Sequence, residues 1–158
     1  MTRDHKPNDS AEREHVEALG GSVEWFGDVD LHGRPLERTG VYRINGNLAL
    51  SRAVGDRAEK PWVTSVADVA HHPIEEGGDS FILLATDGLF DVMTSQEAVT
   101  FVNEIVESTV GSSEELSPEQ WHEMQRDVAN RLVEEALRRG SSDNITVLIL
   151  WLEAAKGC

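Results

Sequence analysis

The sequence predicts an α+β fold in which a mainly antiparallel sheet carries helices on one face. Residues 81–85 form an apolar run that stops just before Asp87, whereas residues 145–152 form an apolar run, rich in β-branched side chains, that begins just after Asp143. Both runs have the composition of buried strands. Because the acid follows one run and precedes the other, antiparallel pairing would bring both acids to the same edge of the sheet.

The part of the chain before these strands predicts smaller elements. Asp9 and Glu12 have the spacing of a capping box that starts a short helix, which the glycine pair at 20–21 ends. Three glycines and mixed charges over residues 27–40 predict an exposed loop or flap. The other expected elements are a strand over 23–26, a hairpin over 41–50 around Asn45-Gly46, and a strand over 62–69.

Two longer helices are predicted between the two apolar strands. Thr94 with Glu97 predicts a capping box at the start of the first helix, and Ser117 followed by a proline predicts the start of the second. The second helix is expected to run to Arg139, where a glycine follows. The residues expected on the buried stripes of these helices are Ala98, Phe101, Val102, Ile105 and Val106, and then Trp121, Met124, Val128, Leu132 and Leu137.

The two acids at the sheet edge predict a metal site. Carboxylates gathered in one place repel each other unless a cation lies between them. Oxygen ligands suit hard divalent ions, so Asp87 and Asp143 predict a site for Mg²⁺ or Mn²⁺. Taken singly, each motif has a plainer interpretation, because Asp-Gly after a strand is commonly a turn and Asp-Asn before one is commonly a cap or bend. Their joint placement favours the metal.

Four segments of the chain, in order, resemble motifs of one enzyme family. They are residues 4–7 (DHKP), 47–56 (NLALSRAVGD), 87–92 (DGLFDV) and 140–147 (GSSDNITV). Together they resemble the second half of the catalytic domain of the type 2C, metal-dependent protein serine/threonine phosphatases. The resemblance implies an antiparallel β-sandwich flanked by α-helices, of which residues 1–158 would be a single partial domain with a flap or loop over 27–60.

The resemblance also implies an activity and the residues behind it. The activity is the dephosphorylation of phosphoserine and phosphothreonine in phosphoprotein substrates by a metal-activated water. Asp87 and Asp143 are implied as ligands of a two-metal centre of Mg²⁺ or Mn²⁺, and Asp4 and Asp91 would help Asp87 to hold a further, weaker metal. No catalytic residue is implied beyond these metal ligands.

The resemblance departs from the family pattern at an important point. The first half of the family domain carries an Asp-Gly-His-Gly motif, whose aspartate bridges the two metals, an arginine that clamps the phosphate, and a histidine proposed as the acid. The only Asp-Gly in this chain is Asp87-Gly88, and His32-Gly33 follows Leu31, so no such motif is present. Gly88 and Asn144 are expected to support the metal ligands structurally.

Three interpretations therefore stay open. The chain is part of an active metal-dependent phosphatase, a non-catalytic type 2C-like regulatory or binding module, or a structural domain whose acids lie in turns. Four ordered motifs disfavour the third interpretation. An Asp-Gly-His-Gly motif upstream of residue 1 would decide between the first two.

Composition limits the partners and the compartment. The chain has 14 basic and 29 acidic side chains, and 14 − 29 = −15, which opposes binding to nucleic acid or to an anionic membrane. The single cysteine, Cys158, excludes an internal disulfide and lacks the Cys-x5-Arg loop of cysteine-based phosphatases. No apolar run approaches the roughly 20 residues of a membrane helix. These features predict a soluble, monomeric protein of the cytoplasm or nucleus.

Three other groups of polar residues are expected to have no role in the site. Adjacent side chains on an extended chain point to opposite faces, so His71 and His72 are not expected to share a metal. Arg43 is expected to be a solvated strand residue. His122 and Arg126 are expected on the outer face of the second long helix.

Overall fold

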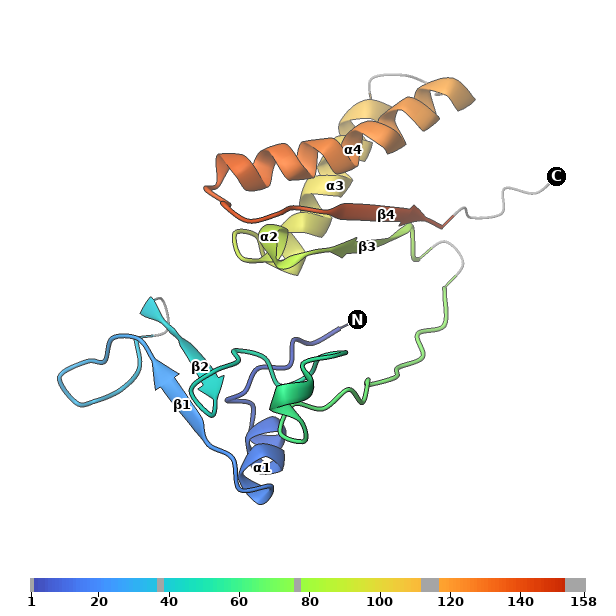
Figure 1. The fold of residues 1–158 in the computed structure, drawn as a ribbon. Coiled ribbons are helices and arrows are strands. Elements are labelled where there is room, and N and C mark those ends of the chain that lie inside the picture. Colours follow the sequence, from blue (N-terminus) through green and yellow to red (C-terminus); the bar gives the residue numbers. More distant parts are fainter. Residues whose placement is uncertain (1, 37–38, 76–77, 112–116, 153–158) are drawn as a thin grey trace. The chain divides into compact units, whose positions relative to one another are not determined.

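The computed structural model describes residues 2–36, 39–75, 78–111 and 117–152. The chain divides into two compact units, Met1–His72 and Pro73–Cys158 (Figure 1). Each unit contains one two-stranded antiparallel sheet and at least one helix, so the predicted α+β class is confirmed. Face-to-face packing of the two sheets stays a prediction.

The first unit is built around a small hairpin-like sheet. Its elements are helix α1 (Ser10–Ala18), strands β1 (Val23–Phe26) and β2 (Val41–Ile44), and the short 3₁₀ helix η2 (Arg57–Glu59). β1 and β2 pair antiparallel, with Val23 opposite Ile44 and Phe26 opposite Val41. The predicted strand over 23–26 is confirmed, and its partner is the first half of the predicted hairpin. The buried apolar residues of this unit are Val16, Val23, Ile44 and Val63.

The predicted turn at Asn45-Gly46 is confirmed by its backbone. Asn45 has φ 50° and Gly46 has φ 73°, the left-handed values that a type I′ turn requires at both central positions. A bridge between Ile44 and Leu48 closes the turn. Residues 27–36 form an exposed loop, as expected, in which Asp30 accepts hydrogen bonds from two backbone amides.

The predicted capping box at the start of α1 is wrong, although the helix begins where expected. Asp9 occupies the N-cap position but makes no side-chain cap hydrogen bond. Glu12 is buried, and its carboxylate accepts hydrogen bonds from Arg52 instead. A buried carboxylate is stabilised more by hydrogen bonds from a charged guanidinium than by one from a helix N-terminus. Glu12 therefore binds Arg52, although Arg52 is distant in the sequence.

The strand predicted over residues 62–69 is also wrong. Only Thr64 makes a bridge, in parallel orientation with Arg52, and the stretch after it is irregular. Val66 and Val69 are 69% and 83% exposed, so the apolar residues that favoured a strand bury little surface here. β-branched side chains favour a strand, but a strand forms only where a neighbouring strand pairs with it.

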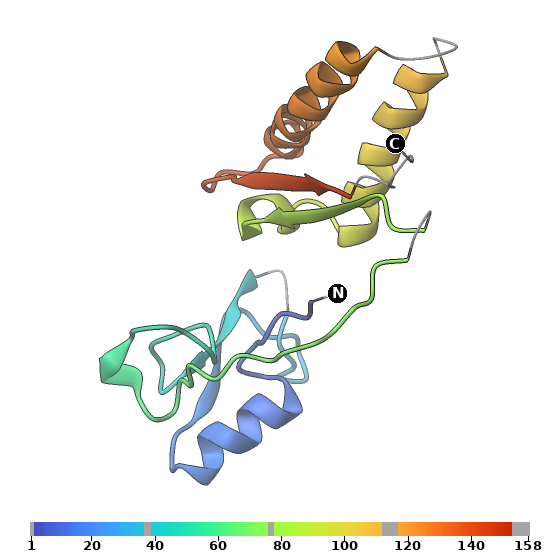
Figure 2. The ribbon, with the colours of Figure 1, turned by 90° about the vertical axis from the view of Figure 1, so that its right-hand side faces the viewer.

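The second unit places two helices on one face of two paired strands (Figures 1 and 2). Its elements are β3 (Phe81–Ala85), the one-turn helix α2 (Asp87–Phe90), α3 (Ser95–Val110), α4 (Pro118–Arg138) and β4 (Val147–Trp151). β3 and β4 pair antiparallel, from Phe81 opposite Trp151 to Ala85 opposite Val147. The predicted pairing of these strands is therefore confirmed, whereas α2 was not predicted. No helix of the described residues is both long enough and apolar enough to cross a membrane.

Both long helices begin as the sequence predicts. Thr94 and Glu97 form a complete capping box at α3, and Ser117 and Gln120 form another at α4. The core between the helices and the sheet consists of Leu89, Met93, Ala98, Val102, Ile105, Met124, Val128, Leu132 and Ala136.

One residue of the predicted stripes is misplaced. Leu137 is 56% exposed, and Ala136 takes the buried position at the end of α4. Leu137 lies five residues after Leu132, which is about 140° around a helix of 3.6 residues per turn, whereas Ala136 lies four residues after Leu132, about 40° around it.

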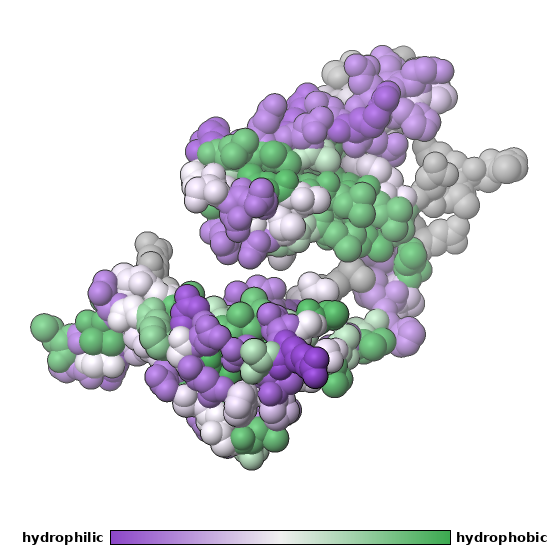
Figure 3. Space-filling view, viewed as in Figure 1, coloured by the Kyte–Doolittle hydropathy of each residue, from purple (hydrophilic) through white to green (hydrophobic). Residues whose placement is uncertain are grey.

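The two faces of the β3–β4 pair differ in what covers them. Phe81, Leu83 and Ala85 pack with their partners on β4 against the helices. The opposite face carries Leu84, Leu148 and Leu150, which are 52%, 61% and 53% exposed, together with half-buried Ile82. In Figure 3, apolar side chains gather on the visible surface of the second unit, around its strands. We call these four residues the outer apolar face.

Candidate metal centre

The ends of β3 and β4 bring the two predicted acid motifs together. Ala85 ends β3 opposite Val147, the first residue of β4, so the chain after β3 and the chain before β4 lie at the same sheet edge. Asp87 is the first residue of α2, and Asp143 lies in the segment that leads into β4. The sequence prediction of a shared edge is confirmed at the level of the backbone.

Hydrogen bonds join these two segments directly. The Thr86 hydroxyl donates to the Asn144 carbonyl at 3.0 Å and accepts from the Thr146 amide at 3.0 Å. Gly88 lies so close to the other segment that a Cβ atom on it would come within 2.4 Å of the Asn144 carbonyl oxygen. Real Cβ atoms do not approach a carbonyl so closely, so only glycine fits between the two motifs.

Side chains of the one-turn helix α2 differ in burial. Leu89 is fully buried in the core of the second unit, and its carbonyl accepts the Met93 amide at 3.0 Å. Asp87 and Asp91 on the same turn are exposed. A buried leucine thus holds the turn, while the two carboxylates stay accessible to a ligand.

The carboxylates of Asp87, Asp91 and Asp143 have the chemistry of ligands for a hard cation. No hydrogen bond or ion pair to the carboxylates of Asp87 or Asp91 is found among the described residues, and Asp143 accepts only the Asn144 amide at 2.7 Å. Acceptor-only oxygens without cationic partners suit Mg²⁺ or Mn²⁺. However, no three His, Cys, Asp or Glu side chains in the described part of the chain lie close enough together to hold a metal. The donors therefore fit a divalent ion in kind, and they form only part of a site.

The fourth predicted ligand, Asp4, belongs to the first unit. Its carboxylate is 82% exposed, and its ion-pair partner is Lys6, at 3.7 Å. Whether Asp4 joins the acids of α2 at one metal stays a prediction.

Sequence reasoning missed two residues that hold the acid-bearing turn. The Ser141 hydroxyl donates to the Gly88 carbonyl at 2.6 Å, and the Arg139 guanidinium donates to the Val92 carbonyl at 3.3 Å. Neither residue type predicts such a contact, because the accepting carbonyl is set by the fold. The only available signal was a hydroxyl two positions before Asp143.

Arg139 is itself held by two carboxylates. Its guanidinium donates to Glu97 at 2.7 Å and to Glu135 at 2.8 Å. The hydrogen bond from Arg139, with those of the Thr94 amide and hydroxyl, lowers the pKa of Glu97 to about 2. Hydrogen bonds from Arg138 and Arg139 lower the pKa of Glu135 to about 2 as well. Both acids are therefore ionised throughout the neutral range.

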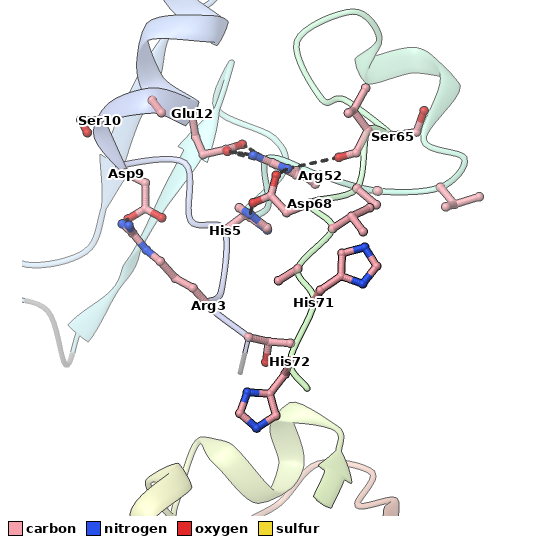
Figure 4. Close-up of a pocket in the computed structure, with 18 residues that line it drawn as sticks. Arg3, His5, Asp9, Ser10, Glu12, Arg52, Ser65, Asp68, His71 and His72 are labelled. Atoms are coloured by element: carbon pink, nitrogen blue, oxygen red, sulfur yellow. Dashed lines mark hydrogen bonds and ion pairs between the residues drawn. The ribbon is translucent and has the colours of Figure 1, made fainter. Parts of the chain in front are cut away.

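The first unit contains a separate hollow of about 1110 Å³, shown in Figure 4. Arg52 lies on its wall between Glu12, at 3.0 Å, and Asp68, at 2.7 Å, and Asp68 also contacts His5 at 2.8 Å. The hydrogen bond from Arg52 lowers the pKa of Glu12 and, together with one from His5, that of Asp68.

Both arginines that line this hollow among the described residues are paired with carboxylates. Of the two arginines on its wall, Arg52 is bound by two carboxylates and Arg3 pairs with Asp9 at 3.3 Å. Its other basic groups are histidines, among them His71 and His72.

Comparison with protein families identifies the chain's relatives. The family model described as "Protein phosphatase 2C" matches residues 1–145. The chain belongs to the protein phosphatase 2C family. A curated relative, protein phosphatase 1E of Mus musculus, is 35% identical over 152 residues, which cover 96% of this chain and 17% of that protein.

Two solved structures share the fold of this chain. A Caenorhabditis elegans sex-determining protein superposes with a TM-score of 0.74 at 28% identity, covering 97% of this chain and 32% of that one. A Toxoplasma gondii phosphatase superposes with a TM-score of 0.64 at 30% identity, covering 94% of this chain and 40% of that one. The chain thus spans well under half the length of these relatives.

Proposed function

We propose that this chain supplies part of the active site of a metal-dependent protein serine/threonine phosphatase. The observation that carries the proposal is the contact between the Asp87 turn and the Asp143 segment at one sheet edge, made by Thr86, Gly88 and Asn144. Membership of the protein phosphatase 2C family supports it. The substrates would be phosphoproteins carrying phosphoserine or phosphothreonine.

The acids of this chain would hold the metal rather than react with the phosphate. When bound, a divalent metal pair supplies a water acidic enough to ionise near neutral pH and neutralises charge on the phosphate. Asp87, Asp91 and Asp143 would hold Mg²⁺ or Mn²⁺, and their ionised form is the one that binds. Asp4 would contribute to a further, weaker site.

The chain should have little or no turnover by itself. Two-metal catalysis needs a ligand that holds the two ions roughly 3.5–4 Å apart, and the sequence has no counterpart of the family's Asp-Gly-His-Gly aspartate. A small aryl phosphate with added Mn²⁺ tests this directly. We expect activity only when a family segment bearing Asp-Gly-His-Gly precedes residue 1, with Asp143→Asn as the control for contaminating phosphatase.

Two outcomes would change the proposal. Robust turnover by the isolated chain that is lost in Asp143→Asn would show that its own acids suffice. If turnover is absent even in the completed protein, the alternative gains support, namely a non-catalytic regulatory or binding module. That alternative is favoured by the absence of three converging metal-ligand side chains among the described residues.

A further inference from the structure

The turn that carries Asp87 and Asp91 is held at both ends by one neighbouring segment. Near its start, the Gly88 carbonyl accepts the Ser141 hydroxyl at 2.6 Å. Just past its end, the Val92 carbonyl accepts the Arg139 guanidinium at 3.3 Å. Both donors come from the stretch that ends α4 and leads to Asp143, so this stretch contacts the turn at both ends.

We propose that Ser141 is a positioning residue for the metal ligands, and that Arg139 assists it from the other end of the turn. The inference rests on the proposed function. Ser141 lies two residues before Asp143, and the carbonyl that it binds lies one residue after Asp87. This hydrogen bond is thus a second link across the sheet edge, beside the one from Thr86 to Asn144, and it helps to set the separation of the two acids.

The other contacts of the turn restrain different atoms from the one that Ser141 binds. Leu89 fixes the depth of the turn in the core, because its side chain is fully buried. Thr86 fixes the end of β3, since its hydroxyl binds the Asn144 and Thr146 backbone before α2 begins. Neither contact restrains the carbonyl beside Asp87. The half-buried Ser141 hydroxyl does, at a distance typical of a strong O–H···O bond.

Two carboxylates hold the Arg139 side chain in the orientation in which it contacts the turn. Glu97 on α3 and Glu135 on α4 both accept hydrogen bonds from its guanidinium, at 2.7 and 2.8 Å. The planar group is thereby fixed with one nitrogen toward Val92. Its neighbour Arg138 binds Glu135 at 2.7 Å and contacts no part of the turn among the described residues, which makes it a matched control.

The test uses the 158-residue chain and Mn²⁺, read by paramagnetic broadening of backbone amide signals. In the wild type, the amides of residues 87–91 and 143–144 should broaden together at the same Mn²⁺ concentration. Ser141→Ala should need about fivefold more Mn²⁺, the effect of one net hydrogen bond. Ser141→Thr, which keeps a hydroxyl, should restore the wild-type response, and Ser142→Ala should leave it unchanged.

Stability is measured separately, by thermal unfolding in EDTA, so that a folding defect is not mistaken for a positioning defect. If Ser141→Ala does not fold, Ser141→Cys replaces it, since a thiol has similar shape and is a weak donor. Arg139→Ala should also weaken the response, whereas Arg138→Ala should not. A Ser141 variant that folds and broadens at the wild-type Mn²⁺ concentration overturns the inference.

Asp87→Ala separates this inference from the proposed function. It should abolish the joint broadening. If amides 143–144 broaden equally in Asp87→Ala and in the wild type, the two acids share no metal, and both the proposed site and the role of Ser141 are overturned. If Asp87→Ala abolishes the response while Ser141→Ala leaves it intact, only the role of Ser141 is wrong.

Discussion

Among the residues that the structure describes, each unit contains one arginine that binds two carboxylates, but the surroundings of the two arginines differ. Arg52 in the first unit binds Glu12, which is only 6% exposed, next to an apolar core of four buried residues. Arg139 in the second unit lies outside a core of nine buried residues. Arg52 therefore compensates a carboxylate that is buried beside a small core, whereas Arg139 also donates to the backbone beside the candidate site.

The largest expected effect comes from the core of the second unit. Leu132→Ala should lower the free energy of unfolding of this unit by about 2–5 kcal/mol, because it leaves a cavity among buried side chains. Urea unfolding followed by tryptophan fluorescence measures it. Leu137→Ala is the matched control, since its side chain is mainly exposed and should change stability by no more than about 0.5 kcal/mol. Equal effects of the two substitutions would contradict the assignment of the core.

A smaller effect is expected from the polar contact of the first unit. Glu12→Gln keeps the size of the side chain but removes the charge that Arg52 binds. We expect faster hydrogen exchange of the β1 and β2 amides, by less than Leu132→Ala causes in β3 and β4. Glu14→Gln, an exposed position on the same helix, should leave exchange unchanged. Protection that is unchanged in Glu12→Gln would assign the stability of this unit to its apolar core instead.

Capping of α3 should contribute less to the stability of the second unit than its core does. Thr94→Ala removes the hydroxyl that accepts the Glu97 amide, and it should cost about 1 kcal/mol. Thr94→Ser retains the hydroxyl and should recover most of the loss. A serine variant as unstable as the alanine variant would show that the threonine methyl group, not the cap, is responsible.

The smallest effect is a dependence on pH. The pKa values of Glu97 and Glu135 are about 2 in the folded chain, below their ordinary value of 4.5. Their stabilising contribution is therefore complete above about pH 4.5 and is lost as the pH falls toward 2. Glu97→Gln should lose less stability than the wild type between pH 5 and 3, measured by unfolding at each pH. Parallel stability curves would show that the Arg139 contact does not favour ionised Glu97.

The sequence predicted those features that depend on neighbouring residues. The caps at Thr94 and Ser117 and the turn at Asn45-Gly46 are local chemistry, and all three are confirmed. The β3–β4 pairing was predictable because both strands are apolar and their acids have opposite order.

The features that sequence reasoning missed depend on distant residues. Glu12 binds an arginine 40 positions away, and Ser141 binds a carbonyl 53 positions away. The one-turn helix α2 is held by the burial of Leu89, which is a property of the assembled core. Local patterns do not contain these contacts, and they are the ones that shape the candidate site.

The outer apolar face of β3 and β4 affects the solubility of the chain. Leu84, Leu148 and Leu150 would attract the same face of another copy, while the net charge of −15 keeps copies apart. Salt shortens the range of that repulsion to about 10 Å at 0.1 M and does not weaken apolar attraction. Solubility of this chain should therefore fall as salt is added, and dilute buffer is the condition in which it stays dispersed.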